Sequence, residues 1–232
     1  MEFLFASDEW QVLMDNLPNL PFATWESFYA TAISTILAMV VGLPLGVLLV
    51  AGEKDGVLPL PGWLMTLLNA VINLLRSVPF LILMIAVLPL SMAVLGTSIG
   101  TPASIIPLFI ASFPFVSRLV ETSLREVDGG VIEAAQSMGA TPMQIITKVM
   151  IPESLPSLIA NATIAMTTIL GYSAMAGIIG GGGLGQIAIN YGYYRYKYLI
   201  MVVATVLLVI MVQIFQSIGT WLAVRCDKRL RK

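Results

Sequence analysis

Long apolar stretches that contain few charged side chains limit most strongly what this chain can fold into. Hydrophobic residues make up 58 % of its 232 residues and charged residues only 11 %, whereas a soluble domain has about 25 % charged residues. A helix needs roughly twenty apolar residues to cross the hydrocarbon core of a bilayer. The sequence therefore predicts an all-α integral membrane protein with room for about five or six crossings.

The positions of the apolar stretches and of the basic residues predict five transmembrane helices. Four of them are expected at about 27–51, 103–120, 155–179 and 198–224. The region 57–95 fits either two spans or an interfacial helix at about 62–75 followed by one span over 77–95. Lys and Arg collect on cytoplasmic flanks, and five spans put ten of the twelve basic residues on one side. We therefore expect five spans, the N-terminus outside and the C-terminus in the cytoplasm.

The residue types that are missing exclude several classes of function. The chain has no histidine and one cysteine, so zinc and haem sites built from such residues are not expected, and no metal site is predicted. Ser173 lacks the histidine partner that a serine nucleophile uses. The glycine run 180–185 lacks the Gly-Lys-Ser/Thr of a phosphate-binding loop. The chain itself is therefore predicted to be non-catalytic.

The stretch EAAQSMGATPMQIITKVMIP, residues 133–152, carries charges, a glycine and two prolines between apolar segments. It predicts a first short helix at about 130–138, stopped by Gly139. Thr141 is expected to cap a second helix that has Pro142 at its first position and Gln144 completing a capping box. Such a structured elbow suits docking onto another protein. The simpler alternative is an ordinary amphipathic helix at the interface.

A second group of candidate residues lies late in the fourth span and in the glycine run that follows it. The candidates for a translocation path or gate are Tyr172, Ser173, Met175, Gly182 and Gly183. The glycines fit either a flexible helix–loop junction or a gate that rearranges, and the three residues of the span fit either path lining or plain packing. Arg76 fits either an intramembrane functional charge or a snorkelling interfacial residue.

Glu133-Ala-Ala, followed after three residues by Gly139 and after nine more by Val149-x-Ile151-Pro152, resembles the cytoplasmic EAA loop of ABC-importer permeases. Over about residues 24–220 the chain is similar to the methionine-importer permease family. The matching stretches are Arg76-Ser-Val-Pro79-Phe, Gly96-Thr-Ser-Ile-Gly100, Met138-Gly-Ala-Thr-Pro142-Met-Gln-Ile145, Gly171-Tyr-Ser-Ala-Met175, Gly182-Gly-Leu-Gly-Gln186 and Tyr191-Gly-Tyr193.

This resemblance implies a type I ABC-importer permease fold in the bacterial inner membrane. Residues 1–23 would form an acidic external extension, 24–220 the permease domain with coupling helices at about 129–150, and 221–232 a basic cytoplasmic tail. The residues implied to contact an ATPase are Glu133, Ala134, Ala135, Met138, Gly139, Ala140, Thr141 and Pro142.

The resemblance also implies partners and a substrate. Two copies of the permease would pair, each docked on one cytoplasmic ATPase, and an external binding protein or lipoprotein would deliver D- or L-methionine or a close derivative. ATP and Mg²⁺ would be bound by the ATPases, so this chain would hold no cofactor, and no nucleic acid is expected. The alternatives are an importer for another small amino acid, a membrane scaffold, and a secondary transporter or channel. A secondary transporter would need buried acids or broken helices near the midplane.

Overall fold

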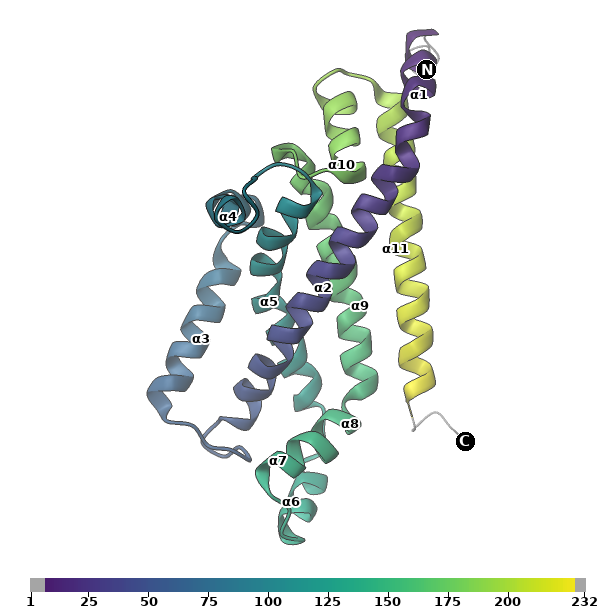
Figure 1. Ribbon diagram of the computed structural model, residues 1–232. Coiled ribbons are helices and arrows are strands. Elements are labelled where there is room, and N and C mark those ends of the chain that lie inside the picture. Colours follow the sequence, from purple (N-terminus) through teal and green to yellow (C-terminus); the bar gives the residue numbers. More distant parts are fainter. Residues whose placement is uncertain (1–6, 228–232) are drawn as a thin grey trace. The chain divides into compact units, whose positions relative to one another are not determined.

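The computed structural model describes residues 7–227, and helices make up most of that range (Figure 1). No strand occurs within it. The helices are α1 (Ser7–Asn16), α2 (Leu20–Ala51), α3 (Gly62–Ser77), α4 (Phe80–Leu95), α5 (Thr101–Arg125), α6 (Gly129–Ser137), α7 (Pro142–Ile145), α8 (Ile151–Glu153), α9 (Leu155–Ala176), α10 (Gly183–Ile187) and α11 (Tyr198–Cys226). The predicted all-α fold is therefore confirmed. The basic residues of the tail at 228–232 lie outside the described range.

The chain forms two compact units, and each is described by itself. The first holds described residues up to 35 together with 79–111 and 166–215, and the second holds 36–78, 112–165 and the described residues from 216. The helices α2, α5, α9 and α11 each contribute one end to each unit.

The first unit is built around apolar side chains from α2, α9, α10 and α11. Its buried cluster consists of Leu20, Ala23, Leu170, Leu184, Ala204, Met211 and Phe215. Helix α1 lies beside the N-terminal end of α11 (Figure 1), where the buried Glu9 carboxylate accepts a hydrogen bond from the Leu199 backbone N–H at 3.0 Å. A carboxylate is favourable at a helix N-terminus, so the N-terminal helix is held by this unit.

The second unit brings helix backbones close together through small residues. A Cβ atom added to Gly42 of α2 would lie 2.7 Å from Val116 Cγ1 of α5, and one added to Gly46 would lie 2.6 Å from Val120 Cβ. Only glycine allows this approach. The Asn161 side-chain amide of α9 donates to Ser123 Oγ at 2.8 Å. In the second unit, α5 therefore packs closely against α2 and is hydrogen-bonded to α9.

Five spans were predicted, and the structure offers four candidate spans, or five if one bent helix pair counts as a span. Four stretches are long and apolar enough to cross a bilayer, namely Glu9–Ala51, Thr101–Arg125, Leu155–Ile179 and Tyr198–Cys226. Helices α3 and α4 pass the same test only as a bent pair. The predicted division into a helix at about 62–75 and a second apolar segment over 77–95 is confirmed by the bounds of α3 and α4, but α4 alone has 16 residues, fewer than the roughly twenty that cross a bilayer. The break falls at Val78, which is extended (ψ 128°) as expected before a proline.

Helix α2 starts earlier than the sequence predicted, and helix α5 ends later than predicted. Helix α2 begins at Leu20 and runs through Glu26, while α5 reaches Arg125 instead of ending near residue 120. Both extensions have the same cause: Glu26 accepts from Thr101, and Glu121 accepts from Arg118 and Arg125. A paired carboxylate is tolerated inside a largely apolar helix. The stretch Leu155–Ile179 has the bounds that were predicted for the fourth span. Helix α11 ends two residues later than predicted.

Candidate functional site

The elbow, residues 129–153 between α5 and α9, has a cap at each end of its first helix, α6. Asp128 caps α6, since its Oδ1 accepts from the Gly130 backbone N–H at 2.7 Å. At the other end Gly139 has a φ of +78°, its N–H donates to the Gln136 carbonyl at 2.9 Å, and the Ala140 N–H donates to the Ala135 carbonyl at 3.1 Å. These two bonds define a Schellman motif. The predicted stop at Gly139 is confirmed.

The second half of the elbow starts as the sequence predicts and continues differently. Thr141 caps α7 in a capping box: its N–H donates to Gln144 Oε1 at 2.9 Å, and the Gln144 N–H donates to Thr141 Oγ1 at 3.4 Å. The sequence did not predict the π-helical turn Ile146–Met150 that follows. Pro152 lies in the short helix α8, and α9 begins at Leu155, where the fourth span was predicted to begin. Proline has no backbone N–H to continue the preceding helical pattern.

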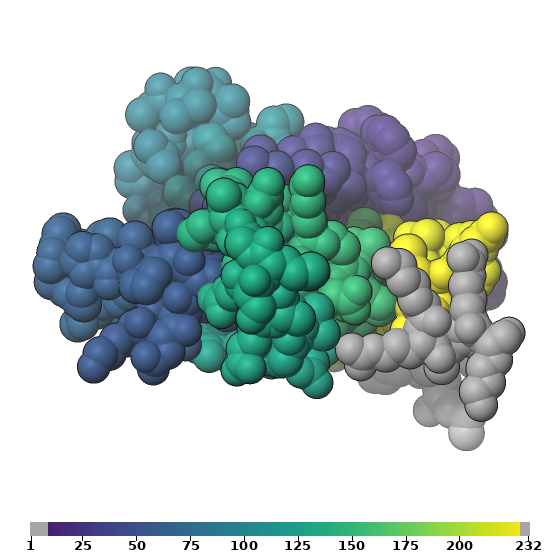
Figure 2. Space-filling view, turned by 90° about the horizontal axis from the view of Figure 1, so that it is seen from below, coloured from purple at the N-terminus to yellow at the C-terminus, as the bar shows by residue number. Residues whose placement is uncertain are grey.

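The predicted coupling residues divide between the surface and the interior of the elbow. Met138 is 82 % exposed beside the turn, and Met143 is also exposed. Figure 2 shows this green segment standing forward from the face in view. Ala135 is only 5 % exposed, so its small size serves packing within the chain, whereas Glu133, Ala134, Gly139, Thr141 and Pro142 are exposed and Ala140 is half-buried. Exposed methionines adapt their shape to a partner surface.

A pocket of about 320 Å³ lies beside α6 and carries negative charge. Its lining includes Glu133 and Gln136 of α6 together with Glu53 and Asp55 of the loop after α2. Hydrogen bonds from the Arg125 guanidinium lower the pKa of the Glu53 carboxyl below its ordinary value of 4.5. The contribution of this pair to stability is thus full above pH 4.5 and is lost as the pH falls through the lowered pKa. Both oxygens of Glu53 accept from Arg125. The charge that suits a basic group therefore comes from Asp55 and Glu133.

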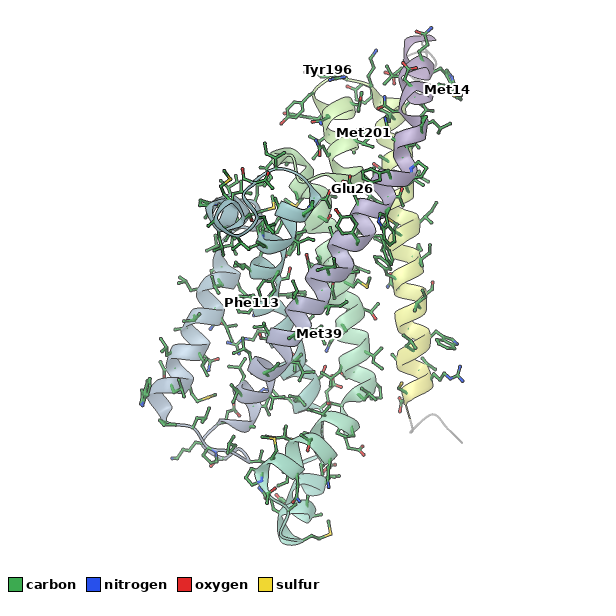
Figure 3. All side chains as sticks on the ribbon, in the orientation of Figure 1. Met14, Glu26, Met39, Phe113, Tyr196 and Met201 are labelled. Atoms are coloured by element: carbon green, nitrogen blue, oxygen red, sulfur yellow. The ribbon has the colours of Figure 1, made fainter. Side chains whose placement is uncertain are left out.

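The glycine run after α9 is ordered by contacts with α2 and α5 in the first unit. The Gly183 N–H donates to Glu26 Oε2 at 3.0 Å, and Glu26 Oε1 accepts from Thr101 Oγ1 at 2.8 Å. The Leu184 N–H donates to Ser27 Oγ at 2.9 Å. Figure 3 labels Glu26 on α2 at this junction. Residues 180–182 of the run form the connection before α10, residues 183–185 are the first residues of α10, and a π-helical turn, Ala188–Tyr193, follows the helix.

The candidate path residues of α9 do not share one environment. Ser173 is 7 % exposed and Met175 is 41 % exposed, while the half-buried Tyr172 ring stacks on Phe80 with centroids 4.1 Å apart. The structure thus brings Gly182 and Gly183 together with Glu26 and Thr101, but it sends Ser173 and Met175 to different faces. Sequence reasoning missed Glu26, although an acidic residue beside an apolar span is a usable signal.

Replacing Glu26 with glutamine should loosen the start of α10. Glutamine can still accept from the Gly183 N–H and can donate to Thr101 Oγ1, because a hydroxyl also accepts, but the acceptor that faces Gly183 becomes neutral. A hydrogen bond to a charged group contributes about 1.5–3 kcal/mol and a neutral one about 0.5–1.5 kcal/mol, so we expect amide hydrogen exchange at Gly183 to accelerate roughly five- to tenfold. Asp15→Asn removes a charge from an exposed position of α1 and should leave this exchange unchanged. Equal protection in Glu26→Gln and the unaltered chain would contradict the assignment.

Four or five candidate spans with a capped elbow between two of them define a multi-pass membrane protein. Residues 42–232 match the family described as binding-protein-dependent transport system inner membrane component. The chain is 50 % identical over 222 residues to the probable D-methionine transport system permease protein MetI of Vibrio cholerae serotype O1, covering 95 % of this chain and 97 % of the relative. It is 44 % identical over 207 residues to the corresponding protein of Pasteurella multocida, covering 89 % and 95 %.

Two solved structures resemble the fold. The MetNI methionine ABC transporter, in an inward-facing conformation, contains a chain that matches with a TM-score of 0.88 at 41 % identity, covering 93 % of this chain and 98 % of that one. A chain of an amino acid ABC transporter matches with a TM-score of 0.69 at 19 % identity, covering 92 % and 98 %, which shows the fold alone. The present chain belongs to the binding-protein-dependent transport system inner membrane component family. The resemblance noted in the sequence is thereby confirmed.

Proposed function

We propose that this chain is the permease subunit of an ATP-driven importer that carries methionine, or a close derivative, across the inner membrane by alternating access. The relatives at 44–50 % identity are methionine permeases by name, which supports the substrate. ATP and Mg²⁺ belong to a partner ATPase, and this chain supplies the path and the mechanical connection.

The exposed elbow with its three helix caps is the observation that carries the mechanical part of the proposal. Caps at Asp128, Gly139 and Thr141 fix its backbone, and its tip projects Met138 and Met143. The elbow docks on the ATPase, and two copies of the chain pair so that two ATPases act together. The negative pocket beside α6 receives a basic group of the ATPase.

The rigid elbow transmits movement because it is joined to spans at both ends. Residues 126–128 separate it from α5, and Ser154 separates it from α9. In the second unit these two helices are held together by the hydrogen bonds of Asn161 to Ser123 and to the Leu119 carbonyl. A displacement of the elbow is therefore imposed on both helices. ATP binding closes the side that carries the elbow, and hydrolysis reopens it.

The proposed orientation places the elbow in the cytoplasm and the glycine-rich start of α10 at the outer side. The N-terminus is outside, and the C-terminal end of α11 is inside. An external binding protein delivers the ligand to the outer side. Gly182 and Gly183 act there in the gate, with Glu26 holding the closed arrangement.

Reconstitution into liposomes tests the function directly. The chain, co-expressed with its candidate ATPase and binding protein, should take up labelled methionine only when ATP is present inside the vesicles with Mg²⁺. Vesicles without the ATPase are the control, and alanine and leucine compete as alternative substrates. Uptake driven by an ion gradient without the ATPase would overturn the importer assignment. ATP-driven uptake of another amino acid in preference to methionine would overturn the substrate.

A further inference from the structure

A concave polar pocket at the C-terminal end of α5 gathers three arginines. Its volume is about 360 Å³. Arg76 comes from the end of α3, and Arg118, Glu121 and Arg125 come from the last two turns of α5, with Phe115 and Leu119 as an apolar floor. All of these residues belong to the second unit. None of them belongs to the elbow or to the glycine-rich segment.

Two of the arginines are fixed by the protein itself. Arg118 donates to Glu121 at 2.6 Å, to Asn69 at 2.7 Å and to Asn73 at 2.9 Å, so three of its five N–H donors are used. Arg125 donates to both Glu53 and Glu121. Because two oxygens of Glu121 already accept from the two arginines, the pocket has no carboxylate left for a further cation.

The third arginine is available. Arg76 is exposed on the rim, and within residues 7–227 its guanidinium has no hydrogen bond or ion pair with another side chain. Three guanidiniums here face two carboxylates, those of Glu53 and Glu121, which leaves a net charge of +1. Pre-organised Arg118 and free Arg76 together offer the planar donors that suit an oxyanion.

The depth of the pocket indicates which oxyanion reaches it. A helix of 25 residues is about 37 Å long, whereas the hydrocarbon core is about 30 Å thick. The end of α5 at Arg125 therefore lies where lipid headgroups begin, and Arg118, seven residues earlier, lies about 10 Å deeper, from where a long arginine side chain can extend toward the headgroups. Basic pockets between transmembrane helices at this level bind anionic headgroups.

We propose that the pocket of Arg76, Arg118 and Arg125 binds the phosphate of an anionic phospholipid, of the phosphatidylglycerol type. Arg76 and Arg118 donate to the phosphate oxygens, and Phe115 and Leu119 contact the glycerol and the first methylene groups. A zwitterionic amino acid fits less well, because its ammonium group would meet three guanidiniums and an already occupied Glu121. The proposal depends on the membrane setting of the chain and not on the transported substrate.

Native mass spectrometry of the purified, delipidated complex tests this site. Phosphatidylglycerol is titrated against the unaltered chain, Arg76→Gln and Arg195→Gln. The last variant removes an exposed arginine that lies over the Tyr191 ring in the first unit. Losing one charge-assisted hydrogen bond weakens binding roughly tenfold, so we expect that loss for Arg76→Gln alone. Arg76→Lys keeps the charge but lacks the planar pair of donors, so it should restore the binding only in part. Phosphatidylcholine should bind more weakly to the unaltered chain.

Three outcomes would overturn the site. The first is equal phosphatidylglycerol binding by Arg76→Gln and the unaltered chain. The second is release of the bound lipid by millimolar inorganic phosphate, which would assign the pocket to a soluble anion. The third is release by methionine, which would assign the pocket to the transport path. The first two results leave the import of methionine untouched, and the third would place methionine in this pocket without contradicting its import, so failure of this proposal and failure of the proposed function are distinguishable.

Discussion

Replacing Gly139 with proline should abolish coupling between the ATPase and transport. Proline fixes φ near −65°, whereas Gly139 has a φ of +78°, and proline lacks the N–H that donates here to the Gln136 carbonyl. Proline cannot adopt the positive φ of this position and removes one of the two hydrogen bonds of the motif, so the Schellman motif will not form and the two short helices will lose their fixed angle. ATP-driven uptake in proteoliposomes is expected to fall at least about tenfold, with reduced co-purification of the ATPase.

Gly139→Asn is the matched control for this prediction. Asparagine tolerates the left-handed region better than other side chains, and a Cβ atom at this position would meet no atom within 4 Å. We expect its uptake and its ATPase content to stay close to those of the unaltered complex. Normal uptake and normal ATPase content in Gly139→Pro would show that the elbow is not the coupling element.

The elbow could be predicted from the sequence because its signals are local. A glycine that must adopt positive φ, a threonine cap with a proline after it, and a glutamine three residues later each specify backbone geometry within a few residues. Contacts between distant residues do not affect these choices. The same is true of the long apolar helices, whose lengths follow from the hydrocarbon thickness.

The residues that sequence reasoning missed depend on long-range contacts. Glu26 is an isolated acid in an apolar helix until the fold brings Thr101 and Gly183 to it, 75 and 157 positions away. The side chain of Arg118 is held in place by hydrogen bonds to Asn69 and Asn73, which lie 49 and 45 residues earlier. The break between α3 and α4 was one of the two alternatives for residues 57–95, but the 107° bend between these helices could not be read from an apolar run that also fits two spans.

Gly182→Ala should destabilise the gate segment strongly and reduce uptake. Gly182 has φ +77° and ψ −172°, a region that is essentially limited to glycine and costs of order 1–3 kcal/mol for other residues. The new Cβ would also lie 1.9 Å from Thr101 Oγ1 and 3.2 Å from the Thr101 backbone nitrogen. The side chain of Thr101 would have to move, and its hydrogen bond to Glu26 would be lost. Together these effects predict a loss of about 2–4 kcal/mol.

Two further glycines separate the causes of this loss. Gly96 also has positive φ, +73°, but a Cβ there would meet no atom within 4 Å, so Gly96→Ala carries the backbone strain alone, about 1–2 kcal/mol. Gly171 lies in α9 with ordinary φ and open space around it, so Gly171→Ala should be neutral or slightly stabilising. Thermal unfolding midpoints in detergent should therefore fall in the order Gly171→Ala, Gly96→Ala, Gly182→Ala. If the Gly182→Ala midpoint equals that of Gly96→Ala, the Thr101 side chain moves away from the new Cβ without a measurable loss of stability. The hydrogen bond from Thr101 to Glu26 would then not help to fix the start of α10.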